Sequence, residues 1–336
     1  DQSFFAIGIL CVFALPFGLS WLRKQLMIPY SYFIPLCLTP AIVLISRDYY
    51  LTDLAHTTAL VYLFILTLRK GFTHWSTLLL LVICFFIRES TLLVAVSALL
   101  VYGWKRDWRA VGKIFVATVI AWVSLGFLSR YSLPNIHQLP SSIYLLLKVP
   151  FNGLRNLVGI SLTSNTLDLN AGRALCQAAH TISLPPVPLL GGLEQVSFCK
   201  PDWSRAFGTF ILALSVFGTG PLLLGWILRA RKVAFSALPF VIQLAGLSGG
   251  LAFVLAPFFG SSVDRLFAMG WPLFFLTLPY LYAQFFSLTK ERSLDTVWKR
   301  TFVWCPLLGW IGVILLLRTT NHTSVLILQL MGIMIV

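Results

Sequence analysis

Residues 76–103 read STLLLLVICFFIRESTLLVAVSALLVYG, and this stretch decides the class of fold. Its only charged residues are Arg88 and Glu89, which have a run of apolar residues on each side. The apolar residues follow one another without the alternation of a barrel strand, so they predict helices at membrane depth. Basic turns flank the stretch, beginning at Arg69 before it and at Lys105 after it.

The composition of the whole chain agrees with this interpretation. Of 336 residues, 58% are hydrophobic and 11% are charged, and the mean hydropathy is +0.87. A soluble domain has about 25% charged residues, and the 27 Phe and 11 Trp exclude a disordered chain. At about 20 residues per span, we predict an all-α, polytopic integral membrane protein with roughly nine to eleven transmembrane helices.

The predicted organisation has three parts. Residues 1–128 and 207–336 are the N-terminal and C-terminal sets of transmembrane helices, and residues 129–206 are a long extracytoplasmic loop. Taken alternately, the turns between apolar runs fall into two sets. The first set holds three acids and 15 of the 25 Lys and Arg: Arg23, Lys24, Arg69, Lys70, Lys105, Arg106, Arg109, Lys113, Arg229, Arg231, Lys232, Lys290, Arg292, Lys299 and Arg300. The other set holds 10 Lys and Arg with eight acids. The positive-inside rule makes the first set cytoplasmic.

The net charge of +14 is therefore mainly a signal of orientation. It predicts membrane lipid, and not nucleic acid, as the partner of the basic turns. The expected location is the inner (plasma) membrane of a bacterium, with the functional site facing outward. The chain begins with Asp inside an apolar run, and we expect that one or more N-terminal elements are missing from it.

Three predicted outer turns each place an acid beside a guanidinium. They are Arg47-Asp48, Arg88-Glu89 and Asp264-Arg265, with Asp53 about a turn beyond the first. Neither half of residues 76–103 crosses about 30 Å of hydrocarbon at 1.5 Å per residue. The stretch is either a helical hairpin with its tip inside the membrane or one long helix with two charges near its middle. Ionisable groups at that depth are costly and usually face a cavity, although a structural ion pair is the alternative.

The outer loop, Leu128–Arg205, is the only substantial hydrophilic stretch. Within it, Ser141–Ser161 is apolar at helical spacing, with Lys148 and Arg155 interleaved, and this predicts a helix lying in the membrane interface. A short re-entrant span is the alternative. Thr181–Gly192 is rich in Pro and Gly and is expected to be loop.

Smaller features add three expectations. Cys176 and Cys199 lie in the oxidising compartment and can form a disulfide if the geometry of the loop allows it. Gly246 and Gly250 form a G-x-x-x-G pattern that predicts close helix packing. Nucleotide-binding glycine motifs and the HExxH zinc motif do not occur in the sequence, so ATP-driven transport and redox chemistry with a soluble cofactor lack their usual signatures.

Three stretches resemble one known group of proteins. They are FFIRESTLLVAVSALLVYGWKRDWRA (85–110), SSVDRLFAMGWPLFFLTLPYL (261–281) and RDYYLTDLAHTTALVYLFILTLRKG (47–71). They are similar to segments of the multi-spanning glycosyltransferases of the GT-C superfamily, of the mannosyltransferase or arabinosyltransferase kind. Elsewhere only the layout of spans and one long outer loop is similar.

The resemblance implies transfer of a sugar from a polyprenyl-phosphate donor to a glycan, lipid or protein acceptor at the outer face of the membrane. Members of the superfamily use a carboxylate of the first outer loop to take a proton from the acceptor. That carboxylate belongs to an element before the region matched here, so the base is expected to lie outside this sequence.

The residue types suggest roles, because such a transfer needs a base and cations for the leaving phosphate. Arginine suits the second role, since its fork matches phosphate oxygens. The candidate catalytic residues are Asp48, Asp53 and Glu89. The candidate substrate-binding residues are Arg47, Arg88, Lys148, Arg155, Asp264 and Arg265.

Within this set, Arg88 and Arg265 are assigned to the donor phosphate, and Glu89 and Asp264 are expected to orient them. Asp48 and Asp53 are assigned to the acceptor or to a metal, while Lys148 and Arg155 would supply a second phosphate contact. A divalent cation as cofactor stays open, although the sequence contains no cluster of carboxylates within one helical turn that would support one.

Two other functions stay open. A polysaccharide polymerase or ligase of the outer surface would use His137, Arg155, Arg173 and His180 of the long loop. A secondary transporter or flippase would have two related halves with interrupted helices near the midplane. The sequence has no convincing repeat between its halves, and its charges gather at outer turns.

Overall fold

The computed structural model describes residues 2–46, 52–132, 149–160, 162–164, 178–183, 195–199, 201–230, 234–259, 263–289 and 292–319. The described residues are predominantly helical, which confirms the predicted helical class. The helices up to the long loop are α1 (Gln2–Gln25), α2 (Tyr30–Cys37), α3 (Pro40–Ser46), α4 (Asp53–Lys70), α5 (Trp75–Ile87), η1 (Glu89–Thr91), α6 (Leu92–Trp104) and α7 (Trp108–Ser132).

The remaining elements belong to the loop and the C-terminal part. In the loop they are η2 (Leu154–Val158), β1 (Leu162–Ser164), β2 (Ala178–Ser183) and β3 (Gln195–Cys199). The helices after it are α9 (Trp203–Ser215), α10 (Gly220–Ala230), η4 (Phe235–Ala237), α11 (Phe240–Phe259), α12 (Val263–Ala268), η5 (Pro272–Thr277), α13 (Leu278–Thr289) and α14 (Arg292–Thr319).

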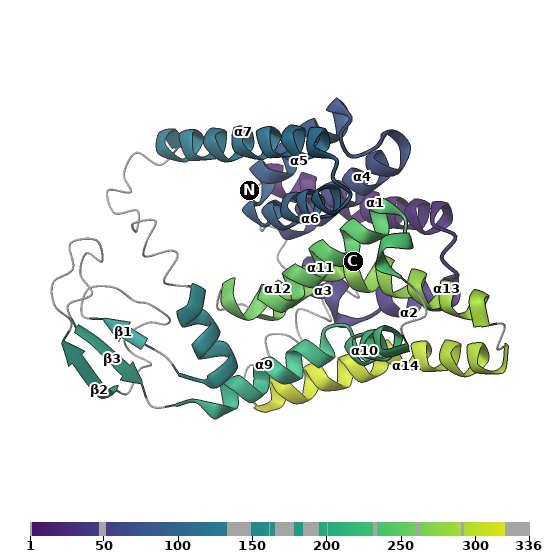
Figure 1. Ribbon diagram of the computed structural model, residues 1–336. Coiled ribbons are helices and arrows are strands. Elements are labelled where there is room, and N and C mark those ends of the chain that lie inside the picture. The colour runs from purple at the N-terminus through teal and green to yellow at the C-terminus, as the bar shows by residue number, and fades with distance from the viewer. Residues whose placement is uncertain are drawn as a thin grey trace.

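In the helical body, α11, α12 and α13 form a middle layer (Figure 1), and α2 and α3 of the N-terminal part pack on α14 of the C-terminal part. Helices α1, α4, α5, α6 and α7 lie on one side of this middle layer, and α9, α10 and α14 lie on the other. The small sheet projects at the end of the body where α9 begins. The charged turn at Arg88 and helix α12 are the parts of this body that matter for the candidate site.

Three helices among the described residues are long and apolar enough to cross a membrane: α1, α7 and α11. A fourth candidate is the pair α9 and α10, which is bent by 71°. Nine to eleven spans are expected over the whole chain, and in the described part several apolar runs are broken into shorter helices. The apolar residues 30–46, for example, divide into α2 and α3, since Pro40 cannot continue the helix that precedes it.

The bend between α9 and α10 has a clear local cause. Gly218 has φ +58°, a conformation that favours glycine. A Cβ atom at this position would lie 1.9 Å from the carbonyl oxygen of Cys305 in α14. The turn therefore packs directly on the backbone of α14, and no larger residue fits there.

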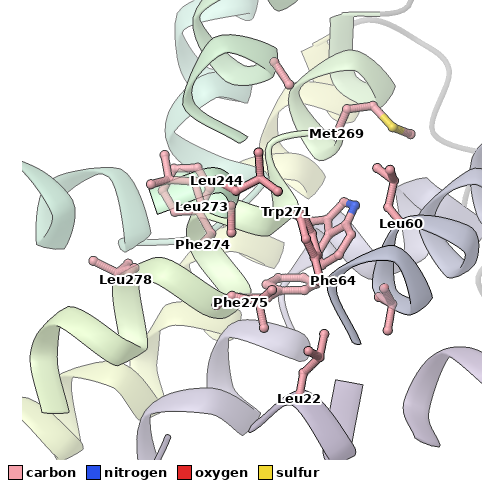
Figure 2. Packing of buried hydrophobic residues seen from close by; sticks show 14 of the residues in the cluster. Leu22, Leu60, Phe64, Leu244, Met269, Trp271, Leu273, Phe274, Phe275 and Leu278 are labelled. Atoms are coloured by element: carbon pink, nitrogen blue, oxygen red, sulfur yellow. The ribbon is translucent and has the colours of Figure 1, made fainter. Parts of the chain in front are cut away.

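The apolar core is centred on Trp271, at the start of the π-helix η5 (Figure 2). Trp271 is completely buried and meets the ring of Phe64 of α4 edge to face, with ring centroids 5.9 Å apart. Phe274 and Phe275 continue this cluster along η5. The contact joins α4, the helix of Asp53, to η5, which follows α12. Arg265 belongs to α12.

The predicted G-x-x-x-G contact is partly wrong. A Cβ at Gly249 would lie 2.4 Å from the backbone nitrogen of Leu273, whereas a Cβ at Gly250 would have nothing within 4 Å. A Cβ at Gly246 would lie 3.2 Å from Thr277. Close packing of α11 on η5 thus uses Gly246 and Gly249, because residues three apart share a helix face.

The long loop contains a three-stranded antiparallel sheet with strand order β1-β3-β2, which the all-α prediction did not include. Within the predicted loop Thr181–Gly192, the first three residues belong to β2, where Thr181 pairs with Ser197. Of the predicted interfacial helix, the described residues 149–158 are helical and end in η2.

The borders of the loop also differ from 129–206, since α7 continues to Ser132 and α9 begins at Trp203. Cys199, at the end of β3, is disulfide-bonded. Cys176 lies outside the described residues. The thiols of Cys84 and Cys305 are free and buried inside the helical body.

Candidate functional site

Asp53 is the first residue of α4 and the centre of the candidate site. A carboxylate in the first turn of a helix is stabilised by the helix dipole. Its side chain is only 3% exposed. A buried carboxylate needs partners of opposite charge, and the turn at Arg88 and helix α12 supply them.

Arg88 reaches Asp53 from the break between α5 and α6. Its backbone is extended, with φ −160° and ψ 133°, so residues 76–103 are not one continuous helix. The backbone nitrogen of Arg88 donates to the carbonyl of Cys84 at 2.9 Å, which completes the last turn of α5. From this position Nη1 of Arg88 forms an ion pair with Oδ1 of Asp53.

Arg265 reaches the same carboxylate from α12. Its Nε lies 2.8 Å from Oδ2 of Asp53, so each oxygen of the carboxylate faces a different arginine. Helix α12 packs on α3, α9 and α11, which fixes the position of Arg265. The structure thus brings together three predicted site residues from three separate outer turns.

Two guanidinium groups share the carboxylate of Asp53. Arg88 lies in the turn between two helices, where its charge interacts with those of Arg265 and Glu89. The side chains of Arg88 and Arg265 remain 12% and 24% exposed. An anion that approached their exposed edges would find charged hydrogen-bond donors already held in place.

A second connection between α4 and the turn runs through His56 and Thr91. The hydroxyl of Thr91 donates to the carbonyl of Arg88 at 2.8 Å, so its oxygen accepts from Nε2 of His56 at 2.9 Å. This bond assigns the ring proton to Nε2. Asp53 and His56 are three residues apart, as are Arg88 and Thr91, so two matched pairs hold the turn against α4.

Sequence reasoning missed His56 and Thr91. The available signal was the spacing of three residues between Asp53 and His56, because residues three apart lie on the same face of a helix. An isolated histidine in an apolar run gave no reason to connect it with a threonine 35 positions away.

Several predicted site residues are placed differently from what their assigned roles require. Glu89 is exposed and forms no ion pair with any residue in the described ranges, so Asp53 holds Arg88 in its place. Asp264 belongs to α12, but its side chain is outside the described part. Three more predicted site residues, Arg47, Asp48 and Lys148, also lie outside the described residues.

Arg155 is buried in η2 rather than exposed at an interface, with 6% of its surface accessible. Its neighbour Asn156 fixes η2 to the end of α11, donating to the carbonyl of Pro257 at 2.7 Å and accepting from Nε of Arg205 at 3.3 Å. Helix η2 therefore lies against the C-terminal end of α11, shortly before α12.

Three buried polar atoms on α4 and on the turn at Arg88 form no hydrogen bond with any residue that the structure describes: Nδ1 of His56, Oγ1 of Thr57 and Oγ of Ser90. Buried polar groups usually have partners, so such atoms suit a bound polar molecule. The described residues contain no group of three His, Cys, Asp or Glu side chains placed to hold a metal ion.

Comparison of the chain with family models, with curated proteins and with solved structures found no match.

Proposed function

We propose that this chain is a multi-pass protein of a bacterial inner membrane that transfers a sugar from a polyprenyl-phosphate donor to an acceptor at the outer face, as the resemblance to GT-C glycosyltransferases implies. The observation that supports it is the convergence of Arg88 and Arg265 on Asp53. These arginines come from two of the outer turns that the charge pattern predicts. Two guanidinium groups held close together suit a phosphate.

Insertion in a membrane is supported by the surface of the helical body. Large apolar side chains are exposed along the outer helices, including Phe17 of α1 (74%), Val123 of α7 (64%) and Leu315 of α14 (58%). Monomeric soluble proteins rarely expose apolar surface of this extent. Hydrocarbon chains would cover it without cost.

The proposed mechanism uses the arginines in the step where the bond between sugar and phosphate breaks. The guanidinium groups of Arg88 and Arg265 hold the phosphate oxygens and stabilise the negative charge that grows on them. Asp53 keeps both groups in position before the donor arrives. Since Asp53 is already neutralised by two cations, it is a positioning residue here, and the base that takes the acceptor proton lies elsewhere.

The test is sugar transfer by the full-length protein in membranes supplied with a radiolabelled polyprenyl-phosphate sugar pool. Arg88→Gln and Arg265→Gln should each lower transfer by roughly 100-fold, as the loss of one oriented donor does in other active sites. Arg109→Gln, an exposed cation of α7 outside the site, is the matched control and should keep normal transfer. Membrane insertion and the unfolding temperature are measured for all three variants.

Normal transfer by both site variants would refute the phosphate role of the arginines. They would then be structural ion pairs, and the polymerase or ligase interpretation, with its residues in the long loop, would be tested next.

A further inference from the structure

A cavity of about 460 Å³ opens between α2 and α14, and it shares no residue with the Asp53 cluster. Its wall on α2 includes Tyr30, Ile34 and Pro35, and its wall on α14 includes Lys299, Arg300 and Val303. The described lining residues carry two cations and no carboxylate. The surface of the cavity is almost entirely apolar, so the alkyl stems of Lys299 and Arg300 line it and their charged groups do not. An apolar cleft with two cationic side chains beside it matches an amphiphilic anion.

The two walls are held together by aromatic contacts behind the cleft. Tyr32 of α2 and Phe302 of α14 meet edge to face, with ring centroids 5.0 Å apart, and both are buried. Nε1 of Trp310 donates to the carbonyl of Leu38 at 3.2 Å, further along the same two helices. The cleft is therefore formed in advance and needs no rearrangement to accept a molecule.

A third cation lies directly behind the wall of the cleft. The guanidinium of Arg23, near the end of α1, stacks on the ring of Tyr30 at 3.4 Å from its centroid. Its Nη1 also donates to the carbonyl of Ile28 at 2.8 Å. Arg23 and the pair Lys299 and Arg300 come from two turns that the charge pattern separately predicts to be cytoplasmic. The structure brings these turns to one place.

The apolar part of the cleft continues onto an exposed apolar face of α14. Val303 is 62% exposed, and Trp304 and Leu307 beyond it are 57% and 48% exposed. On α2, Ile34 is 46% exposed. An acyl chain can follow these side chains, whereas a free phosphate ion would gain nothing from them.

We propose that the cleft binds an anionic phospholipid of the cytoplasmic leaflet. Its phosphate contacts Lys299 and Arg300, and an acyl chain lies along Ile34 and Val303. This inference rests on the membrane insertion proposed above but not on sugar transfer. Binding is measured without any activity, so a failure of the transferase proposal leaves it intact.

The experiment is native mass spectrometry of the whole chain purified in a neutral detergent and titrated with dioleoylphosphatidylglycerol or dioleoylphosphatidylcholine. The unchanged protein should retain the anionic lipid in preference to the zwitterionic one. The double variant Lys299→Gln/Arg300→Gln should bind phosphatidylglycerol roughly 30-fold more weakly, since two cation contacts are lost. The matched control is Arg109→Gln/Lys113→Gln, which removes two exposed cations from another predicted cytoplasmic turn and should bind normally.

A second variant tests the apolar wall without changing the charge. Val303→Trp adds volume to an exposed wall residue, so it should fill the cleft, leave folding intact and weaken phosphatidylglycerol binding at least about tenfold. Unchanged binding in either cleft variant overturns the proposal. Equal loss in the control pair also overturns it, since lipid would then respond to surface charge in general. Full competition by millimolar inorganic phosphate would identify a site for a free anion instead.

Discussion

Replacement of Asp53 by Asn tests how the candidate site is held together. The carboxylate is 3% exposed and has one arginine on each oxygen, at 2.8 Å for Arg265. Removal of one member of a buried ion pair costs about 3–5 kcal/mol, because the remaining charge is buried without compensation. Arg265 is 24% exposed, which favours the lower end of that range. We therefore expect Asp53→Asn to lower the free energy of unfolding by about 3 kcal/mol.

The assay is thermal unfolding of the detergent-purified protein, followed by labelling of buried thiols with a thiol-reactive fluorophore. Cys84 and Cys305 are completely buried and report opening of α5 and α14. A second substitution, Arg265→Gln, removes one of the two cations that lose Asp53 as a partner. The double variant should consequently lose at least about 1 kcal/mol less than the sum of the two single variants.

Glu89→Gln is the matched control, because this exposed carboxylate lies one residue from Arg88 and has no ion pair with the described residues. It should change stability by less than about 0.5 kcal/mol. If Asp53→Asn is as stable as Glu89→Gln, the ion pairs do not hold the turn against α4, and the reasoning is refuted.

Two further predictions concern contacts that support the site. His56→Phe removes the bond to Thr91 and should lower stability by about 1–2 kcal/mol in the same assay; no change would mean that this bond does not hold the turn. Gly249→Ala places a Cβ 2.4 Å from the backbone of η5 and should cost about 1–3 kcal/mol. Gly250→Ala, with nothing within 4 Å, should stabilise α11 by up to about 1 kcal/mol, and equal effects of the two would contradict the packing described.

The sequence by itself determined the helical class, because long continuous apolar runs leave a chain no other way to satisfy its backbone groups at membrane depth. It also located the charged turns, since an arginine beside an acid between two apolar runs is visible without any structure. Arg88 and Arg265 were singled out in this way, and Asp53 was singled out because it lies about a turn beyond the pair Arg47-Asp48. The lengths of the helices were less predictable, because Pro40 and Gly218 break apolar runs that hydropathy alone reads as continuous.

Only the tertiary structure decided which acid forms an ion pair with which arginine. Glu89 is the sequence neighbour of Arg88, yet it is exposed, and Asp53 from the start of α4 forms the ion pair. An adjacent residue leaves the turn in another direction, whereas the packing of α4 on α5 and of α12 on α11 brings distant side chains to the same point. The same packing joined His56 to Thr91 and brought two basic turns together at the cleft between α2 and α14.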